Sequence, residues 1–266
     1  MNEICENPIL VGGCGSSGTT LVKTLLNSHS KVACGPEMSV FDRPKIYEMT
    51  WEGFYNRWQS KAFNYFDEGC IFPLRVDGGK GAYFAFNRDE YHDEKWVDSL
   101  FAKAHDVREF WAGYFSAYAK RKGKLIWAEK TPNNVYCIAD FLNWYPDGRF
   151  VNVLRDGRDV IASLIETRRF DPLRAIFRWI TSVAAYQEYE HHPRVYCVRY
   201  ENLVTKPEAT MAAMIGWLDL EWEHNIYVEN EVRSESVGRW HNLPDDIVPF
   251  IRLACRNQLL ELGYEW

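Results

Sequence analysis

A glycine-rich stretch near the start of the chain constrains the fold more than any other feature. Residues Ile9 to Val11 form a short apolar run that is typical of a buried strand. Four glycines follow before Leu21, and from Gly18 onward the apolar residues recur at helical spacing. A strand, a glycine-rich turn and a helix together favour anion binding, because the backbone can approach the ligand closely and the first amides of the helix point at it.

The candidate phosphate-binding residues end this turn and begin the helix. They are Gly15, Ser16, Ser17, Gly18, Thr19 and Thr20. The spacing Gly13-x4-Gly18-Thr19-Thr20 matches G-x-x-x-x-G-K-[ST], except that Thr19 replaces the lysine. That lysine normally spans the β- and γ-phosphates, so its absence favours a ligand with one phosphate in the loop over a triphosphate. The alternative is a tight strand-to-helix turn without a ligand, which would not require so many glycines and two threonines.

A second candidate anion site follows a later apolar strand, expected at residues 149–154. Arg155 lies at the end of this strand, and Ser163 lies a little over two turns into the helix expected to begin near Gly157. A guanidinium fork beside a hydroxyl suits a second phosphate group. Taken alone, the two residues would be an ordinary surface arginine and an ordinary helix serine. Together with the glycine loop, they predict a ligand that carries two separate phosphates.

Apolar strands alternate with helical segments along most of the chain. Besides residues 9–11 and 149–154, strands are expected at 31–34, 125–128 and 195–198, and helices at 93–122, 134–145, 157–166, 172–189, 207–218 and 245–262. This alternation predicts an α/β fold, a P-loop-like parallel sheet flanked by helices on both faces, with ligands at the carboxyl ends of the strands. Residues 1–266 are expected to form a single domain with an aromatic-rich helical insertion at about 44–122. Its aromatic residues between 44 and 66 are expected mainly in the core, the alternative being the wall of an acceptor pocket, and residues 67–93 are expected to form loops.

Composition narrows the function further. The chain has 31 Lys and Arg against 37 Asp and Glu, a net charge of −6 that argues against broad binding to nucleic acid or an anionic membrane. Local cations must therefore hold any anionic ligand. The seven cysteines include no C-x-x-C pair and the histidines show no metal-ligand spacing, so neither a disulfide framework nor a metal site is expected. We see no signal peptide or transmembrane stretch in the sequence, and we expect a cytoplasmic setting.

Several motifs together resemble the sulfotransferases that use 3′-phosphoadenosine 5′-phosphosulfate as donor. The branch that contains tyrosylprotein sulfotransferases and bacterial members is most similar: it has roughly V-G-G-x-P-R-S-G-T-T-L where this chain has V-G-G-C-G-S-S-G-T-T-L at residues 11–21. Cys34-Gly-Pro-Glu37 resembles the C-G-E-E of that branch, and residues 199–203 and 236–240 resemble segments of its bacterial members. These motifs extend from residue 9 to residue 240, so the resemblance spans most of the chain.

The resemblance implies in-line transfer of a sulfuryl group to a hydroxyl or amine acceptor, such as a sugar, a phenol or a peptide tyrosine, without a metal. Glu37 would be the catalytic base, the glycine loop would hold the 5′-phosphosulfate, and Arg155 with Ser163 would hold the 3′-phosphate. Tyr200 would contact the nucleotide, and Arg239 would close over it from the carboxyl-terminal part of the chain. The acceptor and the oligomeric state cannot be predicted from these motifs.

One departure from the family pattern concerns charge at the loop. Ser16 stands where the family usually has arginine or lysine. Lys130, which follows the strand expected at 125–128, resembles a lysine of this branch and is the candidate replacement, the alternative being a solvated lysine at a strand end. Likewise, the alternative for Glu37 is an exposed loop carboxylate.

Two other functions are left open by the sequence. A P-loop kinase or nucleotide hydrolase would need the missing loop lysine and an aspartate after a strand, for which Asp156 is the candidate. A non-catalytic regulatory protein that binds nucleotides would explain Ser16. Binding of adenosine 3′,5′-bisphosphate and turnover of a sulfate donor distinguish these possibilities.

Overall fold

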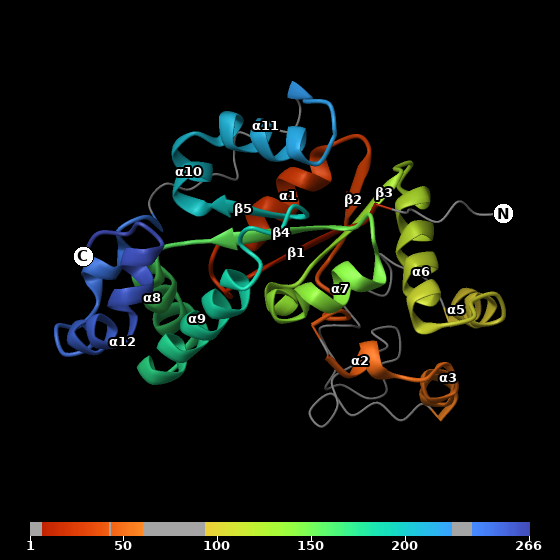
Figure 1. Ribbon diagram of the computed structural model, residues 1–266, viewed down its shortest axis with the longest axis horizontal. Coiled ribbons are helices and arrows are strands. Elements are labelled where there is room, and N and C mark those ends of the chain that lie inside the picture. Colours follow the sequence, from red (N-terminus) through yellow and green to blue (C-terminus); the bar gives the residue numbers. More distant parts are fainter. Residues whose placement is uncertain (1–6, 43, 61–93, 225–235) are drawn as a thin grey trace.

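A central sheet of parallel strands organises the protein (Figure 1). The computed structural model describes residues 7–42, 44–60, 94–224 and 236–266. Within these residues the strand order is β2-β3-β1-β4-β5. The strands are β1 (Ile9–Gly13), β2 (Val32–Cys34), β3 (Ile126–Lys130), β4 (Arg149–Leu154) and β5 (Val195–Arg199). Because all of them run in the same direction, their carboxyl ends meet at one edge of the sheet.

Helices cover both faces of this sheet. They are α1 (Thr19–Ser28), α2 (Pro44–Glu48), α3 (Trp51–Ser60), α5 (Glu94–Phe101), α6 (Val107–Arg121), α7 (Ile138–Trp144), α8 (Gly157–Arg168), α9 (Pro172–Gln187), α10 (Tyr200–Thr205), α11 (Pro207–Trp217) and α12 (Val248–Glu261), with the 3₁₀-helices η1 (Pro132–Cys137) and η4 (Arg239–Asn242).

The alternation of side chains along β1 shows how the two faces are covered. Ile9 and Val11 pack in the apolar cluster that includes α1 and α11, whereas Leu10 packs with α6 and α7 on the opposite face. In Figure 1, α1 and α11 accordingly lie on one side of the sheet, and α6 and α7 on the other. The predicted fold class, a parallel sheet with helices on both faces, is confirmed.

An aromatic core packs against β3 on the second face. Phe41 stacks on Trp127 with ring centroids 5.8 Å apart, and Phe115 of α6 stacks on the same indole at 5.1 Å. Phe54 of α3 is fully buried and belongs to the same cluster, which confirms the prediction that this aromatic residue lies in the core. Tyr55, by contrast, is 41% exposed. The expected aromatic positions 63, 65 and 66, and the loops expected at 67–93, lie outside the described residues.

Two expected helices were wrong in their continuity. The helix predicted at 93–122 is interrupted between Phe101 and Val107, where Asp106 begins α6 by accepting from the amide of Glu109 at 2.6 Å. The helix predicted at 134–145 begins instead as η1, in which the side chain of Asn134 donates to the Val11 carbonyl, and only then continues as α7. The short helix α10 was not predicted. None of the described helices has the length and apolar character needed to span a membrane.

Candidate active site

The glycine loop lies between β1 and α1 at the edge where the strands end. Gly13 has φ +141°, and a Cβ there would stand 2.5 Å from the Val153 carbonyl oxygen of the neighbouring strand. Gly18 has φ +99°, and a Cβ there would stand 2.4 Å from the ring of Tyr200. Both positions therefore require glycine. Among the described residues no side chain caps α1, so its first amides keep the free donors that an anion could use.

The hydroxyl groups of the loop fit an anionic ligand. Ser17 Oγ is buried and has no hydrogen-bond partner among the described residues. Thr19 is also buried, whereas Thr20 is exposed and its Oγ1 lies 3.3 Å from the ammonium nitrogen of Lys130. Gly15 and Ser16 are partly exposed at the tip of the loop. An unpartnered buried hydroxyl beside uncapped helix amides is suited to the oxygens of a phosphate group.

Glu37 and Lys130 meet at this same edge. Glu37 Oε2 lies 3.3 Å from Lys130 Nζ, and the Lys130 side chain is 4% exposed against 26% for Glu37. The same ammonium nitrogen contacts Thr20, so one lysine connects the loop to the carboxylate. The ends of β1, β2 and β3 thereby bring together three residues that the sequence predicted as site residues. Lys130 is buried and paired, which contradicts the alternative of a solvated lysine.

Glu129, which the sequence analysis did not single out, holds this arrangement in place. Its buried carboxylate accepts from the Met38 amide at 3.1 Å, from Thr131 Oγ1 at 2.7 Å and from Asn134 Nδ2 at 2.7 Å. Burial raises the pKa of Glu129 to about 7, although these three hydrogen bonds act in the opposite direction. The contact to Met38 fixes the chain immediately after Glu37. A charged residue in the apolar run I-W-A-E-K was the available signal, because a buried charge requires partners.

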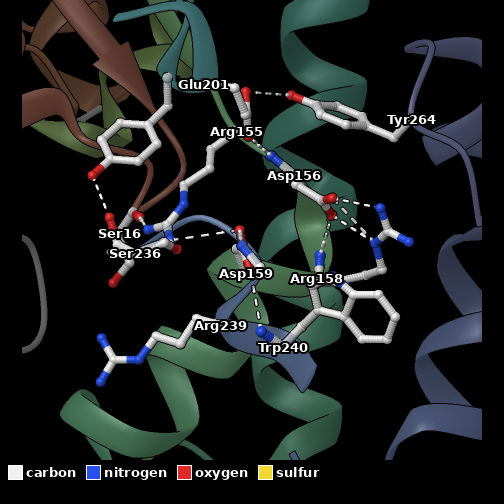
Figure 2. Close-up of polar contacts among 12 residues, drawn as sticks. Ser16, Arg155, Asp156, Arg158, Asp159, Glu201, Ser236, Arg239, Trp240 and Tyr264 are labelled. Atoms are coloured by element: carbon white, nitrogen blue, oxygen red, sulfur yellow. Dashed lines mark hydrogen bonds and ion pairs between the residues drawn. The ribbon is translucent and has the colours of Figure 1, made fainter. Parts of the chain in front are cut away.

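Arg155 lies at the end of β4 and reaches back to the loop (Figure 2). Its guanidinium donates to the Ser16 carbonyl at 3.0 Å and to the Ser236 carbonyl, and it lies over the ring of Tyr200 at 4.6 Å. Tyr200 Oη in turn contacts Ser236 Oγ at 2.5 Å. Arg155 is 5% exposed, and its Nε is buried with no partner in the part of the chain that is described. The arginine therefore joins the glycine loop to the carboxyl-terminal segment.

Asp159 fastens that segment to α8. Its carboxylate, which is 1% exposed, accepts from the amides of Gly238 at 2.9 Å and Trp240 at 3.0 Å (Figure 2). Asp159 Oδ2 also lies 3.8 Å from Arg155 Nη2. Asp159 was not among the predicted site residues, and its only signal in the sequence is a second aspartate inside R-D-G-R-D. These bonds place residues 236–240 beside Arg155.

The last two predicted site residues lie on or beside α8. Ser163 is 9% exposed, and its carbonyl accepts from Thr167 Oγ1 at 2.6 Å. Arg239, in η4, pairs with Glu166 of α8 through its Nε at 2.7 Å, and in Figure 2 its guanidinium lies apart from Ser16 and Arg155. Arg239 is thus near the segment held by Asp159, but its charge is already paired.

Asp156, the candidate metal-binding aspartate of the kinase alternative, is paired with an arginine. Its carboxylate caps α8 and accepts from the Nε of Arg158 at 2.9 Å and from its Nη2 at 2.6 Å. The Asp156 amide donates to Glu201 Oε1 at 2.8 Å. An aspartate that is paired with an arginine in this way is poorly placed to bind a magnesium ion. Across the residues that the structure describes, no group of three or more His, Cys, Asp or Glu side chains is arranged to hold a metal.

The fold and the loop define a class: an α/β protein with a glycine-rich loop between a strand and a helix at the carboxyl ends of parallel strands. A family model described as "Sulfotransferase family" matches residues 8–224. The chain therefore belongs to the sulfotransferase family and is an enzyme of the transferase class. The family resemblance expected from the motifs is confirmed.

Curated relatives and solved structures agree with this assignment. The chain is 21% identical to protein-tyrosine sulfotransferase A of Caenorhabditis elegans over 86% of its length and 54% of the relative's. It is 22% identical to protein-tyrosine sulfotransferase 2 of Gallus gallus over 86% of its length and 56% of the relative's. The chain thus spans little more than half the length of these relatives. The sulfotransferase domain of the Synechococcus PCC 7002 olefin synthase shares the fold, with a TM-score of 0.67, 14% identity, and coverage of 100% of this chain and 98% of that one.

Proposed function

We propose that this sulfotransferase moves a sulfuryl group from 3′-phosphoadenosine 5′-phosphosulfate to a hydroxyl or amine acceptor. The contact between Glu37, Lys130 and Thr20 carries the proposal, because it places a carboxylate and a cation beside a phosphate-binding loop. The donor would supply the activated sulfur. The relatives named protein-tyrosine sulfotransferases favour a peptide tyrosine as the first acceptor to test.

Each predicted site residue would have a separate role in this transfer. Glu37 would accept the acceptor's proton as the new bond to sulfur forms. Lys130 would stabilise the charge that develops on the bridging oxygen as its bond to sulfur breaks, which leaves adenosine 3′,5′-bisphosphate as product. The loop amides and hydroxyls would hold the 5′ end of the donor, and Arg155 with Ser163 would hold the 3′-phosphate.

The test combines a labelled donor with a panel of tyrosine peptides, phenols, sugars and amines. Glu37→Gln should leave the affinity for adenosine 3′,5′-bisphosphate unchanged and reduce turnover by about a hundredfold or more, because it removes the base and not the loop. Glu48→Gln, an exposed carboxylate of α2, is the matched control and should keep full turnover.

Each other outcome contradicts a specific part of the proposal. Near-native turnover of Glu37→Gln would move the base to another residue. Binding of the bisphosphate without turnover of any acceptor would favour a regulatory protein. Magnesium-dependent turnover of ATP would favour a kinase-like enzyme.

A further inference from the structure

With Ser16 at the usual position of an arginine or lysine, the glycine loop contains no cation of its own. The 5′ end of the proposed donor nucleotide is nevertheless strongly anionic. Lys130 contacts Thr20 at the helix side of the loop and is paired with Glu37. Arg155 donates to the carbonyl of Ser16 and reaches toward Ser236. Arg155 therefore contacts the loop backbone at Ser16 and Lys130 contacts its helix side, and neither of these contacts involves Gly15.

Arg178 of α9 lies at that tip. Its Nε is 3.9 Å from the position that a Cβ on Gly15 would take, so the guanidinium lies next to this glycine. Its Nη2 donates to Oδ1 of Asn133, which lies in η1 three residues after Lys130. The Arg178 guanidinium therefore spans from the glycine loop to the segment that follows β3, across the edge of the sheet where the loop and Lys130 meet.

Among the described residues, no carboxylate neutralises the charge of Arg178. No Asp or Glu of the described residues lies within 4 Å of its guanidinium, whereas Lys130, Arg155 and Arg239 each have a carboxylate within that distance. The positive charge is felt inside the loop: burial raises the pKa of Cys14 to about 11, and the hydrogen bond from Ser182 and the charge of Arg178 partly oppose the rise. A half-buried, uncompensated arginine is expected to attract an anion.

We propose that Arg178 supplies, from α9, the cation that holds the 5′ end of the donor nucleotide in place of the residue missing at Ser16. This inference rests on the proposed function, because it assumes that the loop holds the 5′ end of an adenosine bisphosphate. Gly15 is part of the arrangement, because a side chain at this position would come into contact with both Arg178 and Leu164. The bond to Asn133 fixes the direction of the guanidinium.

The experiment compares two ligands that differ only at the 5′ end. Calorimetry measures the affinities of adenosine 3′,5′-bisphosphate and adenosine 3′-monophosphate for the wild-type protein, Arg178→Gln and Arg178→Lys. Arg178→Gln should weaken the affinity for the bisphosphate by about tenfold or more. It should change the affinity for the monophosphate by less than about twofold, because only the bisphosphate carries the 5′-phosphate that Arg178 would bind. Arg178→Lys should recover part of the loss. Arg174→Gln, an exposed arginine one turn earlier on α9, is the control and should bind both ligands normally.

The results separate the possible failures. An unchanged bisphosphate affinity in Arg178→Gln overturns the inference. An equal loss for both ligands also overturns it, because it would mean that Arg178 supports the structure of the site rather than the 5′ group. If the wild-type protein binds neither nucleotide, the proposed function fails and the inference fails with it. A selective loss in Arg178→Gln that the lysine variant partly restores supports both.

Discussion

The carboxylate of Glu129 makes the positioning of the active site sensitive to pH. It is fully buried on β3, next to Lys130 in the chain, and accepts hydrogen bonds from Met38, Thr131 and Asn134. Burial raises its pKa from 4.5 to about 7. In the unfolded chain, the same group titrates near its ordinary value, so folding and protonation at this residue are linked.

The sign of the effect follows from the direction of this shift. Between about pH 4.5 and 7, the folded protein retains a proton on Glu129 that the unfolded chain has lost, so the free energy of unfolding falls as the pH rises. At about 1.4 kcal/mol per pKa unit, the shift corresponds to about 3 kcal/mol across the window. Below pH 4.5 this contribution is fully present, and above the folded pKa it is lost.

Glu129→Gln isolates this contribution, because the amide has nearly the same shape and does not titrate. The NH₂ group of the glutamine would face one of the groups that donate to the Glu129 carboxylate, which lowers the free energy of unfolding by about 1–3 kcal/mol at every pH. Urea unfolding of both proteins from pH 4.5 to 8 should show their stability difference changing by about 3 kcal/mol. Glu52→Gln, an exposed carboxylate of α3, should follow the wild type. Parallel curves for the wild type and Glu129→Gln would refute the reasoning.

Two further substitutions test the second half of the site. Arg155→Ala should weaken the binding of adenosine 3′,5′-bisphosphate by about 2–3 kcal/mol in calorimetry, because charge-assisted hydrogen bonds are lost. An unchanged affinity would show that Arg155 does not bind the 3′-phosphate. Asp159→Asn should reduce stability by about 1–3 kcal/mol, because its amide group faces a backbone N–H, and proteolysis within residues 236–240 should accelerate. Cleavage at the wild-type rate would show that Asp159 does not hold this segment.

The strand, the glycine turn and the helix of the loop could be predicted from the sequence because their determinants are local. The strand, the glycines and the helix are adjacent in the chain, and the positive φ angles of Gly13 and Gly18 are properties of those positions alone. The same holds for Arg155, since a residue that directly follows a parallel strand must lie at the edge where ligands bind. Patterns of neighbouring residues were therefore enough to predict the fold class and the positions of the loop and Arg155 at this edge of the sheet.

Contacts between distant segments could not be predicted in this way. Asp159 bonds residues 79 and 81 positions later, and Glu129 bonds an amide 91 positions earlier. The sequence shows only that Glu129 is a charged residue in an apolar run and that Asp159 is a second aspartate within R-D-G-R-D. That pattern indicates that a partner exists, because an unpaired buried charge is costly, but it does not say which segment supplies the partner.

The missed break before α6 has a different origin. The apolar residues keep their helical spacing through the interruption, so periodicity alone favours one long helix. Asp106 and Glu109 nevertheless form a D-x-x-E capping pattern: Asp106 caps the Glu109 amide, and the Glu109 carboxylate accepts from the His105 amide at 3.0 Å. This local signal was present in the sequence and should have taken precedence over the periodicity.

The pairing of the site's cations decides how the enzyme can recognise an anion despite a net charge of −6. Lys130 has Glu37 at 3.3 Å and Arg155 has Asp159 at 3.8 Å, so each cation is held in position by a carboxylate that also offsets its charge. Long-range attraction from these two residues is therefore small, and Arg178 is the exception at the loop. Recognition must then depend mainly on short, directional contacts from the loop amides and hydroxyls, which select the shape of the ligand as well as its charge.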